Sequence, residues 1–253
     1  TKTKTVEFTI NKADLSKVTI TPKKARVSSS FTYTGEKLTP ALADYDVKLG
    51  DTALSTTDLA DIKITYPASS SANVNAGKEA GSATLTIKDT AKNPNFEGTN
   101  AFKFDIAQAE LTIGGTFTLW KDGKVVGLAK TPTTEPTGTI LTNLDVLFTN
   151  DGTEHTFDKV TYTPANSKYK EGTDYEVKYY NNVRGEVAAI YVNALGNYKN
   201  KEDATHTFAD KKTTFTDARF FKIGSISIKK SDVKVADTEY AGGIAVKPTV
   251  TVL

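Results

Sequence analysis

The chain of 253 residues contains no cysteine and no methionine, and it has only two histidines. Without cysteine sulfur, disulfide bonds and thiolate zinc sites are excluded. Without methionine the chain lacks an initiator residue, and neither a signal peptide nor a sorting motif is visible. We therefore expect a processed product or a fragment. No apolar run is long enough to cross a bilayer, so we expect no membrane insertion.

The chain also lacks a strong excess of charge of either sign. Its 32 lysines and arginines face 30 aspartates and glutamates, which gives a formal net charge of +2. This balance predicts no strong attraction to nucleic acid or to anionic lipid. A hydrophobic content of 38% with 25% charged residues is typical of a folded protein, and the length is sufficient for two ordinary domains.

Alternating side chains dominate the segment 171–200. In residues 175–179, tyrosine and valine alternate with charged residues, which is typical of a half-buried strand. Asn181-Asn182 then predicts a chain reversal, because asparagine tolerates a positive φ. The almost wholly apolar run Val187–Val192 predicts a strand near the middle of a sandwich, and Gly196-Asn197 predicts another turn.

One pattern occurs three times along the chain. The pattern consists of four mostly apolar residues, each separated from the next by two, then three, then two positions. The members are Phe8, Ile10, Ala13 and Leu15; Phe104, Ile106, Ala109 and Leu111; and Phe221, Ile223, Ile226 and Ile228. Spacings of 96 and 117 residues separate the three phenylalanines, about one β-sandwich each. Each occurrence is interpreted as the last strand of one repeat passing directly into the next.

Further runs predict the other strands. They cover residues 18–20, 45–49, 61–66, 83–87, 102–106, 111–119, 144–148, 156–162 and 220–223. Asp122-Gly123 predicts a hairpin turn. Two prolines make Thr131–Thr139 a loop that avoids helix, and Lys201–Thr214 is interpreted as a largely polar insertion.

The motif in residues 172–198 resembles the core of tandem immunoglobulin-like repeats in surface proteins of Gram-positive bacteria. It is carried by Gly172, Thr173, Asp174, Tyr175, Val177, Tyr179, Asn181, Asn182, Gly185, Gly196, Asn197 and Tyr198. Tyr33, Gly35 and Pro40 supply the Tyr-x-Gly and proline opening of such repeats, and Tyr240, Gly242 and Pro248 resemble it again. The resemblance implies an all-β chain of tandem immunoglobulin-like sandwiches, elongated like beads on a string, outside the cell or at the bacterial cell surface.

This interpretation divides the chain into four parts. Residues 1–15 are expected to be the closing strand of a preceding repeat, 16–108 a first domain, 109–225 a second, and 226–253 the opening strands of a further repeat. Neither terminal part could bury a sandwich core alone. Three explanations remain open: a slice of a longer array, a filament in which the tail of one chain completes the head of another, and ends that pack within this chain as edge strands.

The strongest metal candidate is a loop rich in oxygen ligands. Asp89, Asn93, Asn95 and Glu97 crowd it, and calcium prefers such ligands. The spacing does not fit an EF-hand, and Asx-rich turns explain the same residues. We therefore expect no cofactor, with calcium as the alternative. A self-formed Lys–Asn isopeptide bond is conceivable in this class of sandwich, but no motif indicates a particular pair.

Aromatic residues provide the candidates for ligand contact. Tyr175 and Tyr179 share a strand face and are expected in the core, whereas Tyr180 lies on the opposite face. Trp120, beside the predicted hairpin, is interpreted either as an exposed contact residue or as a core residue. His155 and His206 are expected in exposed loops, and with two histidines and no nucleophile elbow there is no case for a hydrolase triad.

We therefore expect a non-catalytic protein, not an enzyme. The favoured function is a structural spacer in a surface-exposed or secreted bacterial protein, which presents other modules or a binding face. Its partners would be the neighbouring repeats, which we expect to dock semi-rigidly because the linker Ile106–Leu111 has no Gly/Ser tract. The alternatives are an adhesin-type module for a glycan or host protein, and a self-assembling filament or surface-layer subunit joined by terminal strand exchange. Much of this argument is an analogy of fold.

Overall fold

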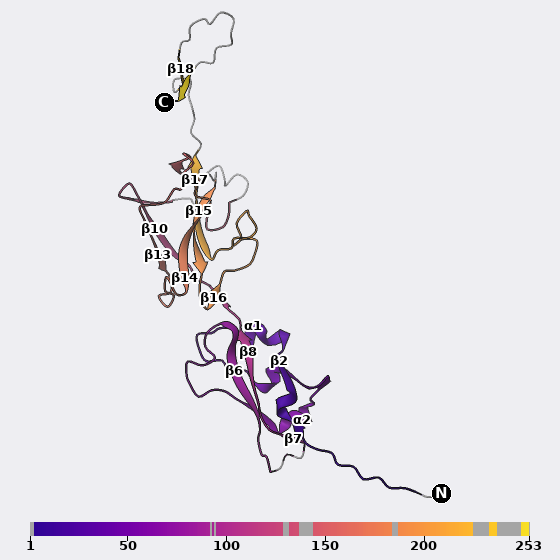
Figure 1. Ribbon diagram of the computed structural model, residues 1–253. Helices are drawn as coiled ribbons and strands as arrows, with labels where there is room; N and C mark the ends of the chain where they lie inside the picture. Colours follow the sequence, from indigo (N-terminus) through magenta and orange to yellow (C-terminus); the bar gives the residue numbers. More distant parts are fainter. Residues whose placement is uncertain are drawn as a thin grey trace, which may run out of the picture.

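The computed structural model describes residues 3–91, 93, 95–128, 132–136, 144–183, 187–224, 233–236 and 249–252. Strands make up most of its regular structure, and its helices are short. The buried side chains fall into one cluster drawn from residues 15–106 and three drawn from residues 111–223. We call residues 13–107 the first unit and residues 109–224 the second unit. Figure 1 shows them one beyond the other, with the N-terminal residues leading away from the first.

The first unit contains eight of the strands and all the described helices. Its strands are β1 (Ala13–Asp14), β2 (Val18–Pro22), β3 (Tyr45–Leu49), β4 (Thr52–Ala53), β5 (Ile62–Thr65), β6 (Gly77–Ile87), β7 (Phe96–Glu97) and β8 (Asn100–Ile106). Its helices are η1 (Leu15–Lys17), η2 (Lys24–Arg26), α1 (Val27–Ser30), η3 (Leu42–Asp44) and α2 (Thr56–Ala60). The strands form two three-stranded sheets, β2-β3-β4 and β5-β6-β8, and a parallel pair, β1-β7.

The core of the first unit lies between these sheets. Alternation places one face of each strand inward, as in β6, where Ala83, Leu85 and Ile87 are buried. Phe104 of β8 pairs with Gly81 of β6 and packs its ring over the glycine. A Cβ on residue 81 would lie 2.2 Å from that ring, so this contact requires glycine.

The second unit contains β9 (Ala109–Glu110), β10 (Gly115–Lys121), β11 (Lys124–Val126), β12 (Val146–Thr149), β13 (Lys159–Pro164), β14 (Tyr175–Tyr180), β15 (Ala188–Ala194), β16 (Tyr198–Lys199) and β17 (Asp217–Gly224). They form a sheet in the order β11-β10-β13, a sheet in the order β12-β17-β15-β14, and the parallel pair β16-β9. The Asp122-Gly123 turn joins β10 and β11, with both residues at positive φ, which confirms the predicted hairpin.

The β12-β17-β15-β14 sheet is covered on both faces. Ile190 and Val192 pack toward the β10-β13 side, whereas Ala189 packs with Phe208 and Phe215. Those two phenylalanines come from Lys201–Thr214 and the residue after it, and both are at most 1% exposed. The prediction of a polar insertion is therefore incomplete, because this loop also closes the outer face of a sheet.

The all-β prediction is confirmed at the level of strand content. The strand predicted at 45–49 forms with these ends, and those predicted at 61–66, 83–87, 102–106, 175–179, 187–192 and 220–223 form with shifted ends. The short helices α1 and α2 were not predicted. Ala13–Leu15 were expected to belong to a preceding repeat, but they are part of the first unit. β1 pairs with β7, and Leu15 is fully buried in the core of this unit.

The terminal segments differ from the units. Residues 3–12 form no strand, and Val6, Phe8 and Ile10 are mostly exposed. Near the other end, β18 (Val233–Val235) pairs with β19 (Val250–Val252) in an antiparallel hairpin. Ile226, Ile228, Tyr240, Gly242 and Pro248, on which part of the repeat pattern rests, lie outside the described residues, as do Gly185 and parts of Thr131–Thr139. In the described part of the chain, every helix is too short or too polar to span a membrane.

Candidate interaction surfaces

The linker between the two units has its backbone bonded on both sides. The Ala107 N–H donates to the Phe31 carbonyl at 2.8 Å, which holds residue 107 in the first unit. The Ala109 N–H donates to the Asn197 carbonyl at 3.0 Å, and β9 continues this contact as a parallel pair with β16. Only Gln108 separates the two attachments. A linker fixed in this way leaves few backbone rotations free between the units.

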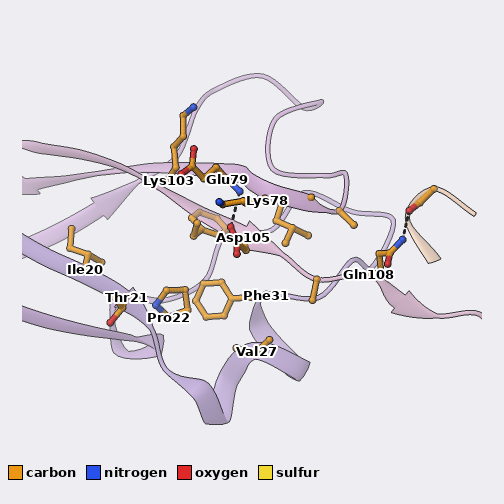
Figure 2. Close-up of a pocket in the computed structure, with 16 residues that line it drawn as sticks. Ile20, Thr21, Pro22, Val27, Phe31, Lys78, Glu79, Lys103, Asp105 and Gln108 are labelled. Atoms are coloured by element: carbon orange, nitrogen blue, oxygen red, sulfur yellow. Dashed lines mark hydrogen bonds between the residues drawn. The ribbon is translucent and has the colours of Figure 1, made fainter. Parts of the chain in front are cut away.

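Side chains from both units cross this junction. The Ala76 N–H donates to the Asn197 Oδ1 at 2.7 Å, and the Asn197 Nδ2 donates to the Asn75 Oδ1 at 3.1 Å. The Gln108 Nε2 donates to the Gly196 carbonyl at 2.8 Å, a bond drawn at the edge of Figure 2. The carboxamide of Asn197 is therefore both acceptor and donor for the loop that precedes β6 in the first unit.

Three tyrosine rings complete the junction. Tyr198 meets Tyr33 of the first unit edge-on, with ring centroids 5.3 Å apart, and meets Tyr169 of its own unit at 5.5 Å. Edge-to-face pairs of this kind contribute about 0.5–1.5 kcal/mol each beyond area burial. Burial, together with the neighbouring phenols Tyr33 and Tyr169, raises the pKa of Tyr198 to about 12. The neutral phenol is thus the form that fits this contact.

A groove of about 860 Å³ lies in the first unit beside the junction. The buried ring of Phe31 lines this groove, together with Pro22 of β2 and Lys103 of β8 (Figure 2). Both strands are at the edge of their sheets. Glu79 and Asp105 border it, and the Glu79 N–H donates to the Asp105 Oδ1 at 2.7 Å. The proline and the charged residues protect these edges against further strand pairing.

A second cavity, of about 820 Å³, lies in the second unit at Tyr180. The Tyr180 ring stacks on Phe208, with centroids 4.0 Å apart and an interplanar angle of 7°. Its described lining also includes Glu135, Asn181 and Lys211. Burial raises the pKa of the Glu135 carboxyl. Tyr180, which was predicted to lie on the strand face opposite Tyr175 and Tyr179, therefore lines a cavity whose wall contains both polar and apolar side chains.

The other predicted contact residue, Trp120, is half-buried on β10. The Lys159 ammonium lies 4.9 Å from the centroid of its ring, and Val125 is its partner on β11. Trp120 lines none of the cavities described above. The structure does not bring Trp120 and Tyr180 into one site: Tyr180 packs with Phe208 beside the outer sheet face, whereas Trp120 lies on the other sheet.

Two of the four calcium candidates use a side-chain oxygen in hydrogen bonds to the backbone. The Asn93 Oδ1 accepts the N–H groups of Asn95 and Phe96 at 2.9 and 2.8 Å, as in an Asx turn. Lys12 places its ammonium 2.8 Å from the Asn93 carbonyl. The Asp89 Oδ1 accepts the Ala91 N–H, whereas Asn95 and Glu97 are exposed. In the described ranges, no three side chains of His, Asp or Glu are grouped to hold a metal ion.

Each of the two histidines lies beside an aspartate and an aromatic ring. His155 stacks on Phe148, and its Nε2 lies 3.3 Å from the Asp151 Oδ1. His206 lies in the loop of the second unit with its Nδ1 2.8 Å from the Asp203 Oδ1. Both lie in loops, as predicted, but both are half-buried rather than exposed, because each ring packs on a phenylalanine. The His155 ring contacts Phe148 of β12, and the His206 ring contacts Phe215.

The junction residues were not singled out from the sequence for contact. Asn197 and Tyr198 belonged to the repeat motif, and Tyr33 to its opening, but nothing in the sequence pairs the two motifs across units. The signal that could have found them is the presence of asparagine and aromatic residues at the predicted turn Gly196-Asn197 and of an aromatic residue at the repeat opening near Tyr33. Comparison of the chain with protein-family models, curated proteins and solved structures found no match.

Proposed function

We propose that this chain is a structural spacer, built from tandem immunoglobulin-like units, that holds other modules or a binding face at a distance from a bacterial cell surface. The observation that carries the proposal is the junction, where backbone pairing, the Asn197 carboxamide and the Tyr33–Tyr198 contact join two separate cores. A spacer transmits position only if its units do not rotate freely about their linker. No catalytic role is part of this proposal.

The arrangement of strands supports the tandem interpretation. In each unit the first strand pairs in parallel with a short late strand: Ala13 is opposite Phe96 in the first unit, and Ala109 is opposite Tyr198 in the second. Each unit then adds its closing strand, β8 or β17, antiparallel to a long buried strand. Because the pairings recur at the positions of the sequence repeat, we interpret the units as copies of one fold. The surface location and the Gram-positive origin rest on the motif resemblance.

Small-angle X-ray scattering tests the spacer directly. We expect the chain to give an elongated particle whose interunit distance distribution has one sharp peak. Insertion of a Gly-Ser-Gly-Ser segment after Ala107 is the control, because it separates the two attachments of the linker without altering either core. The inserted variant should broaden the distribution. If the unmodified chain already shows the broad distribution of the inserted variant, the spacer proposal is wrong.

The cavity at Tyr180 favours a second function, recognition of a glycan. An aromatic ring beside a carboxyl group, an amide and an ammonium group can stack on a sugar face and bond its hydroxyls. A glycan array with the wild-type chain and the Tyr180→Ala variant tests this function. Binding that the substitution abolishes would support it, and the absence of binding to any glycan would leave the spacer as the only function proposed.

A further inference from the structure

Residues 3–12 carry an apolar face with no partner among the described residues. Val6, Phe8 and Ile10 alternate along this segment, and their side chains are 75%, 82% and 84% exposed. Figure 1 shows the segment leading away from the first unit. Alternation of large apolar side chains is typical of a strand with one buried face, and such a face attracts a partner when it is exposed.

The first unit shows what covers the same residues when they are paired. Counting 96 residues onward from Val6, Phe8 and Ile10 gives Phe102, Phe104 and Ile106, the inward side chains of β8. Phe104 and Ile106 are only 3% and 2% exposed, because β8 pairs with β6 and closes the core.

The residue opposite the phenylalanine is small in both units. Gly81 of β6 is opposite Phe104, and Ala188 of β15 is opposite Phe221 of the closing strand β17. A larger side chain there would displace the ring, since a Cβ on residue 81 would lie 2.2 Å from it. A sheet that accepts Phe8 should therefore present glycine or alanine at this register.

Asn95, beside the β1-β7 pair of the first unit, is the second residue that could contact a further unit. Ala13 and Ala109 bond the carbonyls of Asn95 and Asn197 in the same way, so the two asparagines are equivalent. The Asn197 carboxamide bonds the loop before β6 of the preceding unit. Asn95 is exposed, and its side chain has no hydrogen bond in the described part of the chain.

We propose that residues 5–10, together with Asn95, form a docking site for a further unit of this fold that lacks its own closing strand. Residues 5–10 pair with its β6-type strand, Phe8 packs on glycine or alanine, and the Asn95 carboxamide bonds the loop before that strand. The inference rests on the proposed function, because it extends the tandem arrangement to a third unit.

A second copy of this chain does not offer the required sheet. Its β6 is already paired with β8, and its β15 with β17. The β18-β19 hairpin pairs two strands with the order and orientation of β2 and β3. It follows the third occurrence of the repeat pattern as β2 and β3 follow the first, so by sequence position we infer that it is the counterpart of the opening sheet, not of the β5-β6 pair that residues 5–10 would join. Head-to-tail exchange between copies would leave Phe8 without its partner strand.

The test adds the missing sheet to the full chain. Residues 13–99, the first unit without β8, are placed directly before residues 4–253, so that residues 5–10 occupy the sequence position of β8. We expect hydrogen exchange of the amides of residues 5–10 to slow by a factor of about 100 or more relative to the 253-residue chain. We expect Phe8→Asp to abolish this protection. The matched control is Thr9→Asp, which should preserve it, because Asp105 occupies the equivalent outward position of β8.

In the 253-residue chain itself, Phe8→Asp should leave thermal stability unchanged, since that side chain is in solvent. Unchanged fast exchange of residues 5–10 in the extended chain would overturn the proposal. Protection that instead appears in the unextended chain, rises with concentration and accompanies a dimer in light scattering would assign the site to a second copy and also overturn it. In either case, a sharp scattering distribution for the unmodified chain would show that the spacer proposal survives.

Discussion

Replacing Asn197 by alanine should uncouple the two units without disturbing either core. Its carboxamide accepts the Ala76 N–H at 2.7 Å and donates to the Asn75 Oδ1 at 3.1 Å. A hydrogen bond between neutral groups contributes about 0.5–1.5 kcal/mol net. Asn75 is exposed, so water replaces part of the second bond. We therefore expect Asn197→Ala to reduce the coupling between the units by about 1–2 kcal/mol.

The chain provides its own reporter for this measurement. Trp120 is the only tryptophan and lies in the second unit, so its fluorescence during urea unfolding follows that unit alone. Asn95→Ala is the matched control, because the equivalent side chain of the first unit is exposed. We expect Asn197→Ala to lower the free energy of unfolding reported by Trp120 by these roughly 1–2 kcal/mol, and Asn95→Ala to change it by less than about 0.5 kcal/mol.

Equal, small effects of the two substitutions would refute the reasoning. They would mean that the Asn197 carboxamide gains nothing from the first unit that water does not supply. A large effect of Asn197→Ala that persists when the Gly-Ser-Gly-Ser segment separates the units would also refute it, because the energy would then come from within the second unit.

Three further predictions concern packing and pH. Gly81→Ala should destabilise the first unit by about 1–3 kcal/mol in thermal unfolding, because the added Cβ meets the Phe104 ring, whereas Gly114→Ala, with open space around it, should have little effect. Phe208→Ala should destabilise the second unit by about 3–5 kcal/mol in urea, since its fully buried ring covers the outer sheet face; a cost below about 1 kcal/mol would show that the loop does not pack there. Finally, the folded pKa of Tyr198 is about 12, above the ordinary value of about 10, so its neutral form is favoured by folding. Its contribution is complete below pH about 10 and is lost as the pH rises through about 12. The stability difference between wild type and Tyr198→Phe should therefore be constant below pH about 10, and above it wild type should lose stability relative to the variant.

The strands were largely predictable because their signal is local. Alternation in residues 175–179 and the apolar run 187–192 each record one buried and one exposed face, or two buried faces, within a few residues. The hairpin at Asp122-Gly123 was equally local, since both residues tolerate positive φ. The ends of strands and the short helices depend on tertiary contacts, and the sequence predicted them poorly or not at all.

The contact surfaces could not be predicted in the same way. Asn197 and Ala76 are 121 residues apart, and nothing in either local sequence specifies the other. The covering of the outer sheet face was missed because Phe208 and Phe215 are isolated among polar residues of a loop, where no periodicity marks them as core. The calcium hypothesis and the Asx-turn alternative used the same residues, so the sequence could not separate them. In the structure the Asn93 Oδ1 accepts two backbone N–H groups, as an Asx turn requires.

The rigidity of the junction is tested most directly by nuclear spin relaxation of backbone ¹⁵N in the unmodified chain. Amides of β6 report on the first unit and amides of β15 on the second. Our account predicts that one anisotropic rotational diffusion tensor fits both sets, because the units tumble as a single elongated body. Two separate tensors, each with the shorter correlation time of a single unit, would contradict the account and remove the basis for a spacer.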